Sequence, residues 1–376
     1  MVCKSNPAMK VPDLPNIPNT AGLRPDQFGV TIVLSDDLDQ AFVMTRKKLI
    51  ELTQRFPDAA IVADYTGGTK TMTAALVTAV LETDGINLQL VTGNRPDLIK
   101  VKNGTQSVAS ASIDALRYQK GIQPFASAWK RFAYDEAAWG LSAISPPSEN
   151  RFRSLHFRFR DMSAAFAAWD RFDHNQALHL LSGYDRAVGP ILGPYLAVLR
   201  ILTTDGPKQE PMQILDLWQN ALRRVVQGRF DDAMGRCYRT IEWTAQWILR
   251  KDHGIETTDV PADFIPESMQ IIPSPDGRCQ AGLMKAWELI RLKHGGPAKK
   301  LIETHGNRLR DLILLRNRSI LAHGKEPIGE ETWQKMADWM EQAFIPMLLE
   351  ESTVVGIRKA PPQLPDDPDP IQGIGA

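Results

Sequence analysis

The period of the apolar residues changes near Phe125, and this change limits the possible folds more than any other feature of the chain. Before it, short apolar runs predict strands, at residues 29–34, 59–63 and 86–92. Segments between and after the first two runs have helical spacing, at residues 38–56 and 72–81. Alternating strands and helices indicate an α/β domain, and continuously apolar strands are typical of parallel strands that are buried on both faces. The sequence therefore predicts a Rossmann-like N-terminal domain with a doubly wound parallel sheet, over residues 1–124.

After Phe125 the apolar residues recur three and four positions apart, which is the period of an α-helix. This all-α region is expected to comprise a helical connector, a second domain and a proline- and aspartate-rich tail, at residues 125–205, 206–355 and 356–376. A break at Gly228 separates two amphipathic helices, and later helices are expected at 307–322 and 330–349. We find no internal repeat in the sequence. The composition of the tail predicts that it is loosely attached.

Charge and cysteine content exclude several classes of protein. The chain has 44 basic and 44 acidic residues, so no net positive field attracts it to nucleic acid, and any contact with RNA must be local. Cys3, Cys237 and Cys279 lack the spacing of metal ligands, so no metal site is expected, and such sparse thiols are typical of the reducing cytoplasm. With no long apolar run and no signal-peptide core, the sequence predicts a cytoplasmic protein without a membrane span.

A glycine loop, TGGTK, follows the second predicted strand directly and precedes a predicted helix. Gly67 and Gly68 allow the backbone to approach a ligand closely, because no Cβ intrudes. Thr66 and Thr69 carry hydroxyl groups, Lys70 carries a positive charge, and the first N–H groups of a helix favour an anion. The spacing matches neither a Walker loop nor a dinucleotide fingerprint. The sequence therefore leaves two interpretations open, an anion-binding loop and a tight turn with an N-cap threonine.

A second cluster of polar residues, LRNRSILAHGK, contains Arg316, Asn317, Arg318 and His323 on an expected helix. Arg316 and His323 are seven positions apart, which places them on nearly one helical face. Arg318 and His323 diverge unless the helix ends between them, and Gly324 is consistent with such an end. Either arginine can therefore be the partner of the histidine.

These residue types suit the cleavage of RNA without a metal ion. The 2′-hydroxyl attacks the adjacent phosphate, and a histidine with a pKa of about 6.5 takes or gives a proton. An arginine binds the phosphate and stabilises its developing charge, and Asn317 is a candidate to orient the phosphate or the histidine. One chain supplies one histidine to this element, and a symmetric dimer would double the site. The alternative is a structural one, a capping histidine beside solvated arginines.

The two motifs together resemble a known family. DYTGGTKTM is similar to the ligand loop of CARF domains, and RNRSILAHG is similar to the arginine–histidine motif of HEPN ribonucleases. A CARF domain followed by a HEPN domain resembles the ancillary ribonucleases of type III CRISPR systems. The segment NALRRVVQGRFDDAMGRCYRTIE is similar to the helical part of one branch of this family. The resemblance covers the chain from about Gly29 to about Leu349.

The resemblance implies a homodimer that binds a cyclic oligoadenylate as its allosteric activator and then cuts single-stranded RNA without a metal ion. Residues 66–70 match the ligand-binding loop, and Arg316, Asn317, Arg318 and His323 match the catalytic motif. The strand and loop that usually open a CARF domain are not evident before Val30. This difference bears on ligand affinity. The alternative function is a non-catalytic nucleotide-binding sensor or regulatory protein of the same system, and the ring size of the ligand and its degradation by the same loop stay open.

Overall fold

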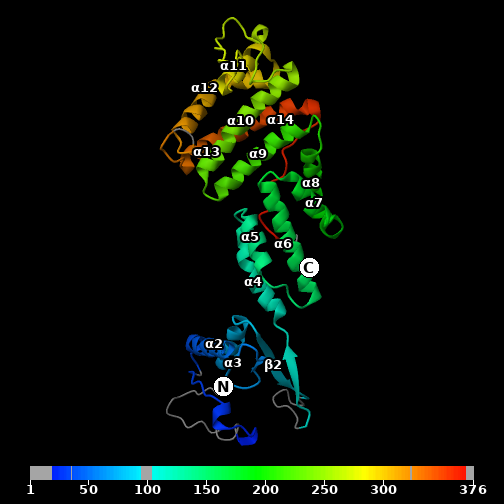
Figure 1. The fold of residues 1–376 in the computed structure, drawn as a ribbon, viewed down its shortest axis with the longest axis vertical. Helices are drawn as coiled ribbons and strands as arrows, with labels where there is room; N and C mark the ends of the chain where they lie inside the picture. Colours follow the sequence, from blue (N-terminus) through cyan, green and yellow to red (C-terminus); the bar gives the residue numbers. More distant parts are fainter. Residues whose placement is uncertain (1–18, 35, 95–103, 322–323, 370–376) are drawn as a thin grey trace. The chain divides into compact units, whose positions relative to one another are not determined.

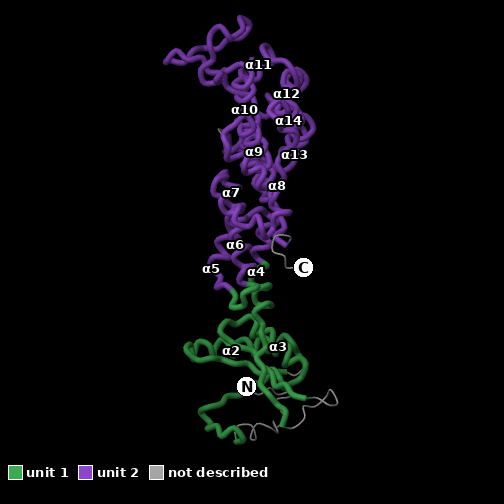
Figure 2. The backbone as a smooth tube through the Cα atoms, turned by 90° about the vertical axis from the view of Figure 1, so that its right-hand side faces the viewer, with its two compact units in different colours: residues 1–123, 147–152 green, residues 124–146, 153–376 purple. Residues whose placement is uncertain are grey.

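The computed structural model describes residues 19–34, 36–94, 104–321 and 324–369. The chain divides into two compact units (Figure 2). Unit 1 comprises residues 1–123 and 147–152, and unit 2 comprises residues 124–146 and 153–376. Strands occur only in unit 1 among the described residues, and unit 2 is built from helices (Figure 1). The predicted change from an α/β to an all-α region is confirmed.

Unit 1 contains a three-stranded mixed sheet in the order β1-β2-β3. Its strands are β1 (Ile61–Asp64), β2 (Ile86–Thr92) and β3 (Ser107–Ala111). β1 and β2 are parallel, with Ile61 opposite Ile86, whereas β3 runs antiparallel to β2. Helices α2 (Leu38–Arg55) and α3 (Lys70–Leu81) supply the side chains that bury the sheet, including Leu49 and Val80. The α/β class is confirmed, with an antiparallel edge on the expected parallel pair.

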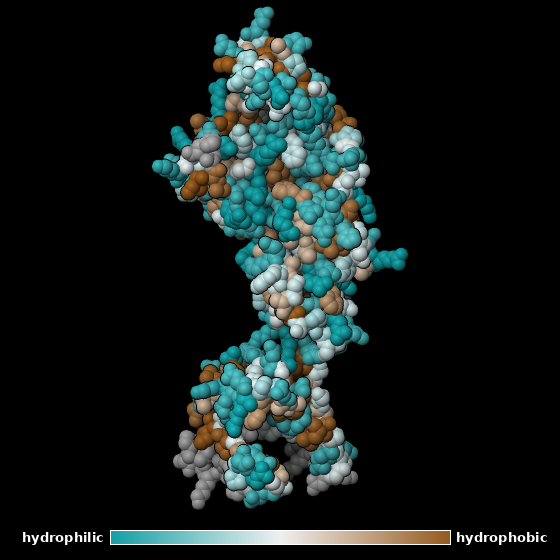
Figure 3. Space-filling view, in the orientation of Figure 1, coloured by the Kyte–Doolittle hydropathy of each residue, from teal (hydrophilic) through white to brown (hydrophobic). Residues whose placement is uncertain are grey.

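The strand predicted at residues 29–34 is wrong. This segment makes no ladder in the described part of the chain, and β1 forms an edge of the sheet. Val33 is fully buried against Ala41 and Ala75, but Val30 and Ile32 stay 42% and 46% exposed. The buried Val33 side chain and the Leu34 N–H, which donates to Gln40 Oε1 at 2.8 Å, hold this segment against the helices. Hydrophobic side chains on the visible face of unit 1 appear brown in Figure 3.

Unit 2 is a series of packed helices. Those wholly within it are α5 (Tyr134–Ala143), α7 (His174–Ser182), α8 (Asp185–Thr203), α9 (Gln209–Val226), α10 (Phe230–His253), α11 (Leu283–Lys293), α12 (Gly296–Arg318), α13 (Glu330–Trp339) and α14 (Ile345–Ser352). Helices α4 (Asp114–Trp129) and α6 (Asn150–Asp170) begin in unit 1 and end in unit 2. A π-helical segment (Met340–Phe344) separates α13 from α14. The indole rings of Trp218 on α9 and Trp333 on α13 stack with their centroids 5.8 Å apart. No described helix is long and apolar enough to cross a bilayer.

Three helix–helix junctions in unit 2 share one backbone geometry. At the centre of each junction one residue has a positive φ, 53° at Phe132, 64° at Phe172 and 71° at Gly228. In each, the next N–H donates to the carbonyl oxygen five residues before it, and these pairs are Ala133–Ala128 at 3.0 Å, Asp173–Ala168 at 2.9 Å and Arg229–Arg224 at 2.9 Å. A fully buried alanine follows in the next helix, at positions 137, 177 and 233. We call these the three αL junctions.

The first two αL junctions also share sequence. AWKRFAYDEA at 128–137 and AWDRFDHNQA at 168–177 have the same residue at half of their ten positions. The prediction that the chain lacks an internal repeat is therefore wrong. The repeat is short, and the third junction shares its geometry with the others but little of their sequence, so sequence comparison misses it.

The C-terminal tail is bound to unit 2 as far as it is described, through Asp369. Gln363 accepts a hydrogen bond from Arg223 Nη1 at 2.7 Å and donates to the Gln219 carbonyl at 3.1 Å. The Tyr134 hydroxyl donates to the Pro365 carbonyl at 2.7 Å, and Leu364 is buried. The prediction of a loosely attached tail is wrong for these residues, because specific backbone and amide hydrogen bonds compensate for its polar composition.

Replacing Gly140 with alanine should destabilise unit 2 by about 1–3 kcal/mol through overpacking. Gly140 is buried in α5, and a Cβ there would lie 2.0 Å from Phe125 Cε1, so the half-buried ring would have to move. Gly235→Ala is the matched control, because Gly235 lies inside α10 with open space around it. There the better helix propensity of alanine should add stability. Thermal unfolding of both variants tests this, and equal midpoints would contradict it.

Candidate functional site

The glycine loop joins β1 to α3 and is held on β2 by hydrogen bonds. The Thr66 N–H donates to Asp64 Oδ1 at 2.8 Å, and the Val91 N–H donates to Thr66 Oγ1 at 2.7 Å. Gln89 Nε2 donates to Asp64 Oδ2 at 3.3 Å. Burial would raise the pKa of Asp64, but the hydrogen bonds from Thr66 and Gln89 outweigh it and leave this pKa below its ordinary value. The carboxylate is therefore ionised at neutral pH and anchors the loop.

The rest of the loop is exposed at the start of α3. Thr69 is the N-cap residue and accepts a hydrogen bond from the Met72 N–H at 3.3 Å. Gly68 has a φ of +107°, a conformation that favours glycine. Lys70 is the first residue of α3, so its ammonium group is at the end of the helix that favours anions. Asp37 is the N-cap residue of α2 and therefore has a structural role.

Helix α12 ends at Arg318, so the prediction that it continues to Ala322 is wrong. The Ser319 N–H donates to the Leu315 carbonyl at 3.0 Å, and the chain then turns back. The Glu326 N–H donates to the Arg318 carbonyl, and the Ile320 N–H donates to the Glu326 carbonyl, each at 3.1 Å. The predicted pairing of Arg316 with His323 on one helical face required the helix to continue past Arg318, and the helix ends there. His323 itself lies outside the described residues.

The two candidate arginines have different surroundings. The guanidinium of Arg316 lies 4.9 Å from the ring centroid of Tyr238 on α10, and its Nη1 lies 3.4 Å from Asn317 Oδ1. Arg318 lines a separate cavity of about 380 Å³ between α12 and α13, together with Arg308, Asp311 and Lys335, so its surroundings are net positive. Burial, together with the charge of Glu242, raises the pKa of Tyr238, so its hydroxyl is protonated and neutral at neutral pH. Arg318 therefore lines a cavity with net positive charge, whereas Arg316 contacts an aromatic ring.

The arginines of α9 and α10 mostly form structural ion pairs, as their alternating charges indicate. Arg223 Nε lies 2.7 Å from Asp170 Oδ1, and Arg224 pairs with the other oxygen of the same carboxylate. Arg239 pairs with Glu242 at 2.7 Å. A further group of arginines, at the αL junctions, was not predicted from the sequence, although the repeated Trp-x-Arg-Phe pattern was a signal for it.

One group of described side chains has the composition of a metal site. Ligand atoms of Asp252, His294 and Glu351 lie within 4.8 Å of one another. However, Lys251 Nζ lies 3.1 Å from Asp252 Oδ2 and 3.5 Å from Glu351 Oε2, so an ammonium group already pairs with both carboxylates. The group links α10, α11 and α14, which is a structural role. Neither Cys237 nor Cys279 takes part, and both are free thiols.

Comparisons with known proteins agree with this architecture. Residues 203–345 match the family model of the Csm6 HEPN domain, and this segment includes Arg316, Asn317 and Arg318. The solved structure of Enterococcus italicus Csm6 bound to cyclic hexa-2'-fluoro-hexa-dAMP is similar, with a TM-score of 0.58 and 14% sequence identity, over 86% of this chain and 77% of that chain. No curated protein matches the sequence. Residues 203–345 are therefore similar to a Csm6-type HEPN domain, and the chain shares its fold with Csm6, in agreement with the predicted CARF–HEPN architecture.

Proposed function

We propose that this protein is a cytoplasmic endoribonuclease that a cyclic oligoadenylate activates and that cleaves single-stranded RNA without a metal ion in type III CRISPR defence. The match of residues 203–345 to the Csm6 HEPN domain carries this proposal, because that segment includes the arginine element. In this proposal residues 1–124 form the CARF domain, residues 125–205 the connector and residues 206–355 the HEPN domain. The similar Csm6 structure holds a cyclic hexa-adenylate analogue, which supports the class of activator.

The proposed chemistry needs His323, an arginine and Asn317. The 2′-oxygen of the RNA forms a bond to phosphorus while the bond from phosphorus to the 5′-oxygen breaks. His323 takes or gives one of the two protons that move, and Arg316 or Arg318 stabilises the negative charge that develops on the phosphate. Asn317, whose Oδ1 accepts a hydrogen bond from Arg316 Nη1 at 3.4 Å, orients the phosphate or the histidine in this proposal. Since one chain contributes one histidine here, a symmetric homodimer supplies the second proton-transfer group.

The activator is proposed to bind at Thr66, Gly67, Gly68, Thr69 and Lys70. These residues are exposed, while Asp64 and Val91 hold the loop in place, so a ligand meets a preformed backbone. The ligand carries phosphates, which suit the N-terminus of α3 and the ammonium group of Lys70. A cyclic oligoadenylate would thus bind the exposed N–H groups and the Lys70 ammonium group, which would have no ligand if the loop were only a turn.

Replacing Gly67 with alanine should weaken the binding of cyclic oligoadenylate by about tenfold or more without changing stability. A Cβ at Gly67 meets no atom within 4 Å, so the free protein tolerates it, but it would intrude where a ligand approaches the backbone. Gly68→Ala differs, because its φ of +107° makes the loop itself strained. Calorimetric titration with cyclic tetra- and hexa-adenylate measures both variants. Unchanged affinity in Gly67→Ala would place the ligand elsewhere.

The overall proposal is tested with purified protein, a fluorescent single-stranded RNA and EDTA. Cyclic tetra-adenylate and cyclic hexa-adenylate are added separately, beside a reaction without activator. Cleavage that requires one of the rings supports the proposal and identifies the ring. Binding of a ring without any cleavage would instead support the non-catalytic sensor. A parallel set of reactions omits EDTA, and cleavage that occurs only in that set would contradict the metal-independent mechanism.

A further inference from the structure

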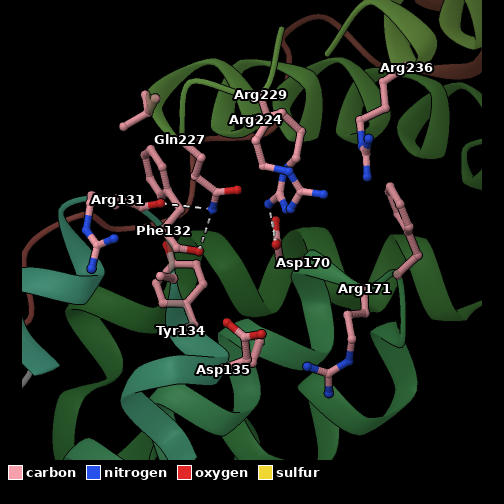
Figure 4. Close-up of a pocket in the computed structure, with 14 residues that line it drawn as sticks. Arg131, Phe132, Tyr134, Asp135, Asp170, Arg171, Arg224, Gln227, Arg229 and Arg236 are labelled. Atoms are coloured by element: carbon pink, nitrogen blue, oxygen red, sulfur yellow. Dashed lines mark hydrogen bonds and ion pairs between the residues drawn. The ribbon is translucent and has the colours of Figure 1, made fainter. Parts of the chain in front are cut away.

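A cavity of about 520 Å³ lies where the three αL junctions of unit 2 meet (Figure 4). Phe132, Phe172 and Gln227 contribute to its wall, one from each junction. The Gln227 amide donates to the carbonyl oxygens of Arg131 at 2.9 Å and Phe132 at 3.3 Å, so the first and third junctions are tied together. The cavity is thus formed by the packing of the three αL junctions. It does not include any residue of the glycine loop or of the arginine element.

The cavity wall carries more positive than negative charge. Its guanidinium groups belong to Arg131, Arg171, Arg224, Arg229 and Arg236, and its carboxylates belong to Asp135 and Asp170. Asp170 pairs with Arg224 and with the buried Arg223, and Asp232 pairs with Arg229 and lies 3.7 Å from Arg236, so the least balanced charges of the wall are those of Arg131 and Arg171. Burial and the charge of Arg224 both lower the pKa of Arg236, as expected where cations are close together. The cavity therefore favours an anion.

Some of these groups have donors that the protein leaves unused. Arg224 is 7% exposed, and its Nε has no hydrogen-bond partner in the described part of the chain. The side chain of Arg171 is exposed and makes no hydrogen bond or ion pair with any described residue. Among the described residues, the guanidinium group of Arg131 pairs only with the exposed Glu136, at 3.4 Å. Planar guanidinium groups with free N–H donors are the usual partners of phosphate oxygens.

An aromatic ring lies beside these cations. Phe172 lines the cavity, is 41% exposed, and has a φ of 64°, which is unusual for a bulky residue. The left-handed backbone at Phe172 costs free energy, and such residues cluster at binding sites. An exposed ring beside guanidinium groups suits a base attached to a phosphate, because the base stacks while the phosphate is bound.

We propose that this cavity binds a phosphorylated nucleotide, with the arginines of the αL junctions on its phosphate and Phe172 against its base. This nucleotide is either a free molecule or part of a single-stranded RNA that passes over unit 2. This site goes beyond the proposed nuclease function, because its occupancy requires neither the activator nor cleavage. It places a nucleotide contact on the connector and the first helices of the HEPN segment.

Binding is measured on the full-length protein without activator, using AMP, ATP and a fluorescent single-stranded RNA made of 2′-O-methyl nucleotides, which cannot be cleaved through the 2′-oxygen. Arg171→Glu should weaken binding by at least about tenfold and reduce its dependence on salt, because a phosphate contact is lost. Arg186→Glu is the matched control, since Arg186 is exposed in the same unit and does not line the cavity. It should stay within about twofold of the wild type, because a charge away from the phosphate is largely screened.

Each outcome bears on the proposal. Loss of AMP and ATP binding in Arg171→Glu identifies a site for free nucleotides, and loss of RNA binding alone identifies a contact with an RNA strand. Equal weakening in Arg171→Glu and Arg186→Glu, or no binding of any of the three probes by the wild type, would overturn it. If Arg171→Glu unfolds at a lower temperature than the wild type, Arg131→Gln replaces it, because Arg131 is exposed and weakly paired.

Discussion

Replacing His323 with alanine should lower the activator-dependent rate of RNA cleavage by about 10²–10⁴-fold, the usual contribution of a general acid or base. The proposed mechanism offers no other histidine on this element to move the proton. Cleavage of fluorescent single-stranded RNA in EDTA, with the activating ring at saturation, measures the effect. Binding of the ring to the variant should be unchanged, because the proposed ligand loop lies in the other unit. A rate within a few fold of the wild type would rule out His323 as the proton-transfer group.

The same assay identifies the catalytic arginine. Replacing the arginine that stabilises the phosphate charge with alanine should lower the rate of cleavage by about 10²–10³-fold, which is the usual effect of losing one preorganised donor at a developing charge. Arg316 lies against Tyr238, whereas Arg318 lines the cavity between α12 and α13, so the two substitutions disturb different surroundings. Arg310→Ala is the control, because Arg310 is exposed on the same helix. Similar rates in all three variants would show that neither arginine acts on the phosphate.

Replacing Asp170 with alanine should lower the free energy of unfolding of unit 2 by about 3–5 kcal/mol, the cost of leaving a buried charge without its partner. The side chain of Arg223 is fully buried and that of Arg224 is 9% exposed, and both pair with this one carboxylate. Asp216 lies 4.0 Å from Arg223 and cannot replace two close contacts. Chemical denaturation followed by circular dichroism measures the loss, and failure to fold would be its extreme form.

Glu136→Ala is the matched control for Asp170→Ala. Glu136 pairs with Arg131 at 3.4 Å, and both side chains are more than half exposed, so the pair should contribute less than about 1 kcal/mol. The contrast isolates burial, since each substitution removes a carboxylate from an arginine in the same unit. Equal destabilisation by the two substitutions would mean that removing Asp170 does not leave an uncompensated buried charge on Arg223 and Arg224.

Much of the fold could be read from local patterns. The strand at Ile86–Thr92 and the helix break at Gly228 follow from a buried apolar run and from a glycine with φ of 71°. β3 was missed because its sequence, SVASA, has small and polar residues without a strong apolar period. The segment at 29–34 has the composition of a strand, but a strand also requires a hydrogen-bonding neighbour, which the described structure does not provide.

The sequence by itself determined the two-part architecture, the exposed glycine loop between a strand and a helix, and the likeness of the helical part to a HEPN domain. These depend on periodicity and on short contiguous motifs, which local spacing encodes. Only the tertiary structure decided that α12 ends at Arg318, because hydrogen bonds from Glu326 and Ile320 compete with continuation of the helix. Only the tertiary structure brought Arg131, Arg171 and Arg229 to one cavity, because three junctions far apart in sequence converge when their helices pack.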